Sequence, residues 1–257
     1  HNALPHERRP GDRLLGRFFL GACDGLVALS EKVADDLECL NIAAPIERVD
    51  HPVYDIFGEK IPRPEARDRL GVPQDVPVLL FFGFIRAYKG LHVLLEAMPE
   101  IIRRRPETKL IVAGEFYDDE RSYRELVASR DLEDSVDFHA RYIPEEEVST
   151  YFAAADLVVQ PYISATQSGV AQIAYHFDRP MIVTDVGGLP EVVPHEEAGF
   201  VVRPDDPESL AAAVDRFFTG DWTERLTEGV RAEKEKYSWD RLYDALEELM
   251  KRSADVS

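Results

Sequence analysis

The stretch VPVLLFFGFIRAYKGLHVLLEAM, residues 76–98, contains the pattern that decides the fold. Its first eight residues form a short apolar run that ends at a glycine, which is typical of a buried strand. Apolar residues at helical spacing begin at Gly90, after a loop that carries two cations, Arg86 and Lys89. A buried strand followed at once by a helix predicts one unit of a parallel α/β sheet.

The same alternation continues along the chain. Helical patterns separate five further strand-like runs, which are KLIVAGE (109–115), SVDFHARY (135–142), DLVVQPY (156–162), PMIVTDVGG (180–188) and GFVVRP (199–204). Six strands with intervening helices predict an α/β fold with a doubly wound, Rossmann-like parallel sheet. In such sheets ligands bind beyond the carboxyl ends of the strands, so the loops at those ends are the candidate sites.

The composition excludes several classes of partner. The chain has 257 residues and a formal net charge of −19, which predicts repulsion from nucleic acids and from anionic membranes. No apolar run reaches 18 residues, so no transmembrane segment is expected. Cys23 and Cys39 have no histidine neighbours at the spacing of metal ligands, and both are interpreted as reduced, buried thiols. With no signal-peptide pattern, these features favour a cytoplasmic location.

The ends of the chain differ from its middle. Residues 1–50 contain a helical pattern, a short strand and a second helical pattern, and are interpreted as the end of a preceding, incomplete domain with a crossing segment. Residues 51–237 form the predicted sheet domain. Residues 238–257 contain a last helix, WDRLYDALEELMK, which is expected to pack back toward the preceding domain.

Two cations at the end of a buried strand indicate a phosphate or diphosphate site. Arg86 and Lys89 would project into the crevice beyond the first strand of the sheet, where they can form charge-assisted hydrogen bonds. The alternative is an ordinary solvated loop.

A second candidate is the loop and helix start in YISATQSGVAQIAYHF, residues 162–177. Thr166 or Ser168 is expected to cap this helix, Gly169 allows close approach of a ligand, and the first amides would favour an anion. The alternative is a plain capped helix. A third loop, TDVGGLPEVV (184–193), is either a ligand loop or a tight turn.

Several motifs are absent from the sequence. It contains no G-x-G-x-x-G, no phosphate-binding P-loop and no G-x-S-x-G, so a dinucleotide dehydrogenase, a P-loop NTPase and an α/β-hydrolase are disfavoured. The histidines form no metal-like cluster, and neither a metal nor a cofactor is expected. The acidic run EEE (145–147) is interpreted as the solvated start of a helix.

The order of the motifs, from the lysine loop through LIVAGE and ADLVVQPY to IVTDVGGLPEVV and GFVVRPDDPESLAAAV, resembles the carboxyl-terminal domain of GT-B glycosyltransferases. The resemblance is to the retaining family 4 (glycosyl transferases group 1) and covers roughly residues 45–252. HNALPHE resembles the end of that family's acceptor-side amino-terminal domain.

The resemblance implies a two-domain enzyme that moves a sugar from a UDP- or GDP-sugar to a glycan, lipid or small-molecule acceptor with retention of configuration and without a metal. It assigns catalytic roles to His1, Arg86 and Lys89, and it places the stretch 140–143 near the base. The donor-binding residues that it implies are Gly83, Arg86, Lys89, Arg141, Tyr142, Thr166, Gln167, Ser168, Gly169, Val170 and Gln172.

The sequence departs from the family pattern at two places. Phe84 stands where members commonly carry an arginine after the strand-end glycine. The family's E-x7-E pair is missing, since its positions fall on Ala165 and Ile173 or, shifted by one, on Ser164 and Gln172. Gln172 can form a hydrogen bond to ribose but has no charge. A non-catalytic module that binds a nucleotide sugar or a protein is therefore the alternative function, and a nucleotide-sugar epimerase is a third.

Overall fold

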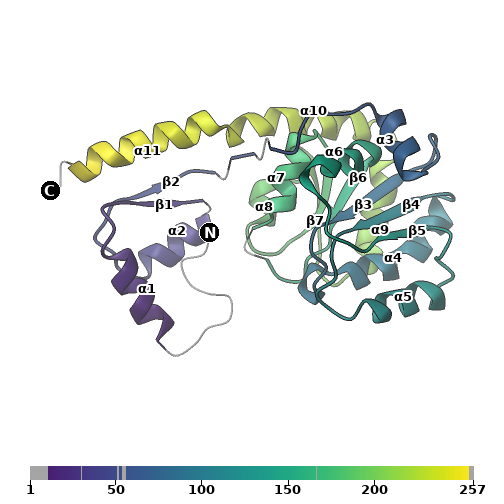
Figure 1. Ribbon diagram of the computed structural model, residues 1–257, viewed down its shortest axis with the longest axis horizontal. Coiled ribbons are helices and arrows are strands. Elements are labelled where there is room, and N and C mark those ends of the chain that lie inside the picture. The colour runs from purple at the N-terminus through teal and green to yellow at the C-terminus, as the bar shows by residue number, and fades with distance from the viewer. Residues whose placement is uncertain (1–10, 30, 51, 54–55, 166, 255–257) are drawn as a thin grey trace. The chain divides into compact units, whose positions relative to one another are not determined.

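The computed structural model describes residues 11–29, 31–50, 52–53, 56–165 and 167–254. The chain divides into two compact units. One consists of residues 54–233, and the other of residues 1–53 together with residues 234–257. Each unit has its own sheet (Figure 1).

The unit of residues 54–233 contains the six-stranded parallel sheet predicted from the sequence, in the order β5-β4-β3-β6-β7-β8. The strands are short, and all except the edge strand β5 are mostly buried, which explains why these five appear in the sequence as continuous apolar runs. The strands are β3 (Val78–Phe82), β4 (Lys109–Ala113), β5 (Val136–His139), β6 (Leu157–Gln160), β7 (Met181–Thr184) and β8 (Gly199–Val202).

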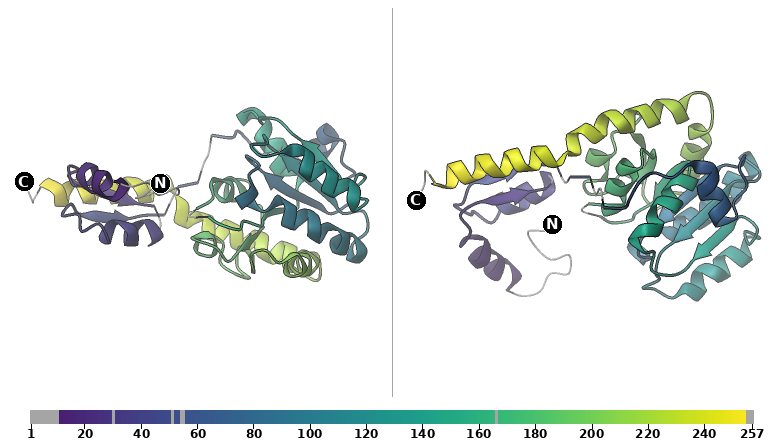
Figure 2. Two further views of the ribbon diagram at one scale, coloured as in Figure 1. Left: turned by 90° about the horizontal axis from the view of Figure 1, so that it is seen from below. Right: turned by 45° about the horizontal axis from the view of Figure 1, so that its top comes forward.

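Helices cover both faces of this sheet (Figures 1 and 2). On one face α3 packs against α6, and on the other α4 packs against α9. An apolar cluster on this second face joins α4 and α9 to the strands of the sheet. The helices are α3 (Arg63–Leu70), α4 (Leu91–Arg104), α5 (Glu120–Ser129), α6 (Glu145–Ala154), α7 (Gly169–His176), α8 (Leu189–Val192), α9 (Pro207–Phe217) and α10 (Trp222–Lys234).

The strand order creates a switch point between β3 and β6. The chain proceeds from β3 outward to β4 and β5, then returns past β3 to β6 and continues outward on the other side. Since the loops after β3 and β6 leave the sheet toward opposite sides, a crevice opens between them at the carboxyl ends of the strands.

The other unit contains a small parallel sheet and three α-helices among its described residues. Its elements are α1 (Asp12–Leu20), β1 (Leu26–Ala28), α2 (Glu31–Glu38), β2 (Ile46–Arg48) and α11 (Trp239–Ala254). β1 pairs with β2, and α11 lies along β2, where Arg252 Nη1 forms a 2.6 Å ion pair with Glu47.

The two thiols are free, but the expectation that both are buried is wrong. Cys23 is half-buried and Cys39 is exposed, because Cys39 follows the last turn of α2 instead of lying on its apolar face. In the described part of the chain, no helix is long and apolar enough to span a membrane.

Candidate active site

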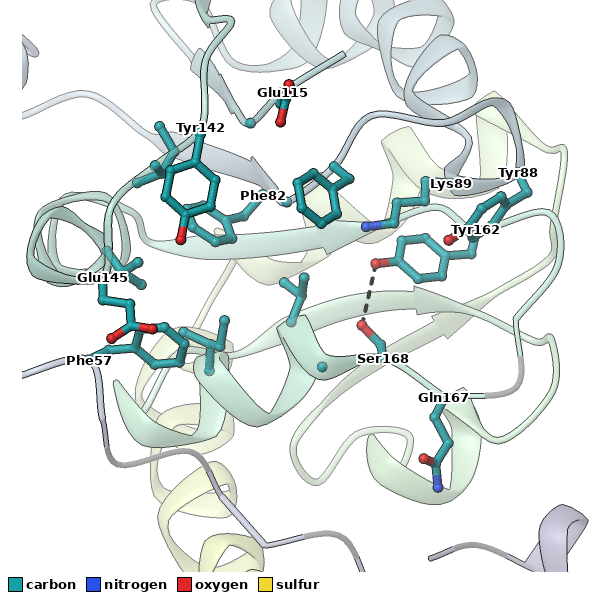
Figure 3. A pocket seen from close by; sticks show the side chains of 18 residues that line it. Phe57, Phe82, Tyr88, Lys89, Glu115, Tyr142, Glu145, Tyr162, Gln167 and Ser168 are labelled. Atoms are coloured by element: carbon teal, nitrogen blue, oxygen red, sulfur yellow. Dashed lines mark hydrogen bonds between the residues drawn. The ribbon is translucent and has the colours of Figure 1, made fainter. Parts of the chain in front are cut away.

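A cavity of about 460 Å³ lies at the switch point, beyond the carboxyl ends of β3 and β6 (Figure 3). Five segments contribute to its walls, so the fold assembles it from distant parts of the sequence. The lining residues are Phe57, Phe82, Gly83, Phe84, Tyr88, Lys89, Gly114, Glu115, Tyr142, Ile143, Glu145, Val148, Tyr162, Gln167, Ser168, Gly169, Val170 and Ile173.

Gly83 follows β3 and leaves room for the Lys89 side chain. Its φ of +97° is one that glycine adopts easily. A Cβ at Gly83 would lie 3.3 Å from Lys89 Nζ and 3.3 Å from Val170 Cγ2. A larger residue would therefore push the ammonium group and the start of α7 apart.

Lys89 supplies a positive charge inside the cavity. It ends a short 3₁₀ turn, Ala87–Lys89, and its Nζ lies 5.7 Å from the centre of the Tyr162 ring. Burial lowers the pKa of the Lys89 ammonium to about 8, and the nearby charge of Arg86 adds to this effect. Among the described residues, no carboxylate forms an ion pair with Lys89. An anion that enters the cavity would supply the missing counter-charge.

Arg86 does not line the cavity with Lys89. It is exposed, and its guanidinium carbon lies 4.7 Å from the centre of the Tyr117 ring. The Tyr117 ring in turn makes an edge contact with Phe84, with ring centres 5.0 Å apart. Phe84 itself lines the cavity.

The β6 side of the cavity carries two hydroxyl groups. Tyr162 OH lies 3.3 Å from Ser168 Oγ (Figure 3), and Ser168 Oγ donates a 2.5 Å hydrogen bond to Gln160 Oε1. Ser168 is the N-cap residue of α7, but its hydroxyl makes no bond to a helix amide. Gln160 thus takes the hydroxyl that was expected to cap the helix, and the amides at the start of α7 carry no side-chain cap from Ser168.

The opposite side of the cavity is aromatic and acidic. Tyr142 and Ile143 follow β5, Glu145 begins α6, and Phe57 comes from the segment before α3 (Figure 3). Tyr142 is 59% exposed, so its ring is available for contact with a ligand.

Arg141 is directed elsewhere. Its guanidinium forms an ion pair with Glu147 and lies 3.4 Å from Tyr151 OH, and it does not line the cavity. Glu147 holds the pKa of Arg141 above its usual value. Arg141 therefore fixes the loop that presents Tyr142, to whose carbonyl oxygen it also donates a 3.3 Å hydrogen bond.

Gln172 also lies outside the cavity lining. Its side chain is only 3% exposed, and its Oε1 has no hydrogen-bond donor within the described part of the chain. His1 and Thr166 lie outside the described residues.

Of the predicted site residues, Arg86, Arg141 and Gln172 lie outside the cavity lining, whereas the following line it: Gly83, Lys89, Tyr142, Gln167, Ser168, Gly169 and Val170. Sequence reasoning did not select Phe57, Glu145 or Tyr162. Tyr162 had a usable signal, because it directly follows a predicted buried strand at its carboxyl end.

Comparison with known proteins gives a consistent result. The family described as "Glycosyl transferases group 1" matches residues 76–219. An uncharacterized glycosyltransferase of Methanocaldococcus jannaschii is 35% identical over 180 residues, which cover 68% of this chain and 45% of that protein. A D-inositol 3-phosphate glycosyltransferase of Streptomyces scabiei is 30% identical over 244 residues, 90% of this chain and 54% of that protein. The chain thus spans about half the length of the curated relatives it matches.

Solved structures share the fold. Sucrose-phosphate synthase from Thermosynechococcus elongatus superposes with a TM-score of 0.80 at 24% identity, over 98% of this chain and 63% of that one. Anabaena HepE in complex with UDP and glucose superposes with a TM-score of 0.79 at 18% identity, over 98% of this chain and 69% of that one.

Proposed function

Because this chain belongs to the glycosyl transferases group 1 family, we propose that it is the donor-binding part of a retaining hexosyltransferase. The enzyme moves a sugar from a nucleotide-diphosphate sugar to a glycan, lipid or small-molecule acceptor. The observation that carries the proposal is Lys89, a cation inside the switch-point cavity with no carboxylate paired to it among the described residues.

The diphosphate of the donor occupies the Lys89 side of the cavity. The Lys89 ammonium can donate charge-assisted hydrogen bonds to phosphate oxygens there, while the Ser168 hydroxyl already donates to Gln160 Oε1. Gly169 and Val170, the first residues of α7, also line the cavity, and the start of a helix favours a negative charge. HepE, which has the same fold, was crystallised with UDP and glucose, which agrees with a nucleotide donor.

The same groups assist the reaction. When the bond between the anomeric carbon and the diphosphate breaks, negative charge grows on the departing phosphate oxygen. A fixed cation that touches this oxygen stabilises the transition state more than the bound donor, which lowers the barrier. Arg86, outside the cavity lining, adds positive potential nearby. No side chain of the chain needs to act as a nucleophile in this scheme.

Calorimetric titration with nucleotide diphosphates tests donor binding. We expect UDP or GDP to bind the chain, and Lys89→Ala to weaken binding. In the full-length protein, turnover of a nucleotide sugar should give a product with the donor's anomeric configuration, which proton NMR resolves. An inverted product would contradict the retaining mechanism, and failure of every nucleotide diphosphate to bind would contradict the proposal as a whole.

The absence of the E-x7-E carboxylates favours a second function, a module that binds a nucleotide sugar without transferring it. Of the two residues on which the second carboxylate position can fall, Gln172 is buried outside the cavity lining, and Ile173 lines the cavity but is apolar. Binding of the donor by the full-length protein without release of sugar to water or acceptor would identify this module.

A further inference from the structure

We propose that the cavity selects guanine, so that the donor is a GDP-sugar, and that the Glu145 carboxylate reads the base. This inference rests on the proposed function and names the substrate class of the same site. It comes from the separation of charge along the cavity, with Lys89 on one side and Glu145 on the other.

The two sides of the cavity differ in chemistry (Figure 3). Lys89 lies on one side with the hydroxyls of Tyr162 and Ser168, and Glu145 lies on the other with the rings of Tyr142 and Phe57. A diphosphate is attracted to the ammonium group and repelled by the carboxylate. A nucleotide therefore enters with its phosphates toward Lys89 and its uncharged base toward Glu145.

The aromatic rings suit a planar base. Proteins that bind single-stranded nucleic acids stack the bases on tyrosine and phenylalanine side chains. The strength of this contact is nearly independent of which base is bound. Tyr142 is 59% exposed and its loop is held by the contacts of Arg141 with Glu147 and Tyr151. The rings thus supply affinity, and selectivity must come from a polar group.

The carboxylate of Glu145 is that group. An ionised carboxylate only accepts hydrogen bonds, and its two oxygens match two parallel donors. Guanine has such a pair, the N1–H and the N2 amino group, on its Watson–Crick edge. Uracil has one N–H between two carbonyl oxygens, which a carboxylate repels, and adenine has an amino group beside a nitrogen acceptor. Glu145 therefore favours guanine over both.

Neighbouring acids provide controls. Glu146 also lies in the first turn of α6, but it does not line the cavity, so Glu146→Gln removes the same charge from the helix start without touching the base. Glu115 lines the cavity after β4. Glu115→Gln tests whether a different carboxylate reads the base.

The experiment is calorimetric titration of the 257-residue chain with GDP, inosine diphosphate, UDP and ADP. Inosine diphosphate lacks only the N2 amino group of guanine. We expect GDP to bind about tenfold or more tightly than UDP and ADP, because a charge-assisted pair of bonds is lost with the other bases. Inosine diphosphate should fall between them. Glu145→Gln should abolish the preference for GDP over the other three nucleotides, and Glu146→Gln should retain that preference.

Each other outcome is informative. Tightest binding of UDP or ADP, an unchanged order in Glu145→Gln, or loss of the order in Glu115→Gln instead would overturn the assignment to Glu145. Lys89→Ala should weaken all four nucleotides by a similar factor and preserve their order. If none of the four binds the unsubstituted chain, the proposed function fails and the inference fails with it.

Discussion

Gly90 lies directly against the backbone carbonyl of Pro161, so that a Cβ on Gly90 would come within 1.9 Å of the Pro161 oxygen. Gly90 follows the turn that ends in Lys89, and Pro161 follows β6. A 2.7 Å bond from Ile163 N to Tyr88 O joins the same two loops. The loops on either side of the switch point are thus held together, and this contact fixes Lys89 over the cavity.

Gly90→Ala should therefore destabilise the chain for two reasons, the left-handed backbone conformation at this position and the clash of the new Cβ with Pro161. Gly220 is a matched control, since both glycines have φ of +69° but nothing lies within 4 Å of a Cβ at Gly220. Gly220→Ala should cost about 1–2 kcal/mol, the penalty for a left-handed residue with a side chain. Gly90→Ala should cost at least about 1 kcal/mol more, because backbone must move. Urea denaturation measures both, and equal costs would contradict the close contact.

Lys89→Ala should weaken binding of nucleotide diphosphates by about 1.5–3 kcal/mol, the range for hydrogen bonds to charged groups. Lys109 begins β4, at the opposite end of the sheet, and its ammonium donates to the carbonyl of Asp134. Lys109→Ala should leave affinity unchanged. Calorimetry gives both values, and an equal loss in the two variants would indicate an effect of net charge instead of a site.

Nucleotide affinity should fall as the pH rises above about 8. Burial lowers the Lys89 pKa to about 8 in the free chain, and a bound diphosphate stabilises the ammonium and raises that pKa. Between the two pKa values binding takes up a proton, so affinity decreases by up to about tenfold per pH unit. Lys89→Arg keeps its charge throughout and should show no decrease between about pH 7 and about pH 9.5. A flat profile for the native chain would contradict a titrating Lys89.

The stability of the free chain should change in the opposite direction. Since the pKa of Lys89 is lower in the folded chain than its ordinary 10.5, the unfolded chain binds more protons between about pH 8 and pH 10.5. Burying the charged lysine therefore opposes folding below about pH 8, and this penalty disappears as the pH rises.

Most of the sheet was predictable because its strands, apart from the edge strand β5, are buried on both faces. In β3 all five residues, VLLFF, are buried, so the strand is a continuous apolar run that needs no knowledge of its neighbours. α3 was missed for the opposite reason. Its sequence, RPEARDRL, has no apolar periodicity, because its buried positions are Ala66 and Arg67.

The cavity was only partly predictable. A loop that carries cations after an apolar run pointed to Lys89, but nothing in the chain order shows that Phe57 meets Glu145 there. The three consecutive glutamates 145–147 look alike in sequence. In the structure Glu145 lines the cavity and Glu147 pairs with Arg141, while Glu146 does neither. The three glutamates differ in their position in the folded chain, which the periodicity of the sequence does not reveal.

Arg67→Ala should destabilise the chain by about 3–5 kcal/mol, because it removes one of the two arginines that pair with the buried Asp156 carboxylate and leaves buried backbone carbonyls without their donor. Arg67 is fully buried, donates to the carbonyl oxygens of Val76 and Ala154, and forms a 2.9 Å ion pair with Asp156. Arg69, on the exposed side of α3, pairs only with Glu65 among described carboxylates. Arg69→Ala should cost at most about 0.5 kcal/mol. Comparable urea midpoints for the two variants would contradict a structural role for Arg67.

Gln172→Glu should destabilise the chain instead of improving ribose binding. At 3% exposure, the new carboxylate would be desolvated, and its pKa would rise until it is protonated or until the helix shifts. We expect a cost of about 1–3 kcal/mol at neutral pH that decreases in acid, since protonation removes the buried charge. Gln172→Leu removes the unsatisfied Oε1 without adding charge and should be nearly neutral. Thermal unfolding at two pH values measures both variants. Tighter nucleotide binding by Gln172→Glu with unchanged stability would show that this side chain reaches the cavity, and that a carboxylate here can take the place of the missing family pair.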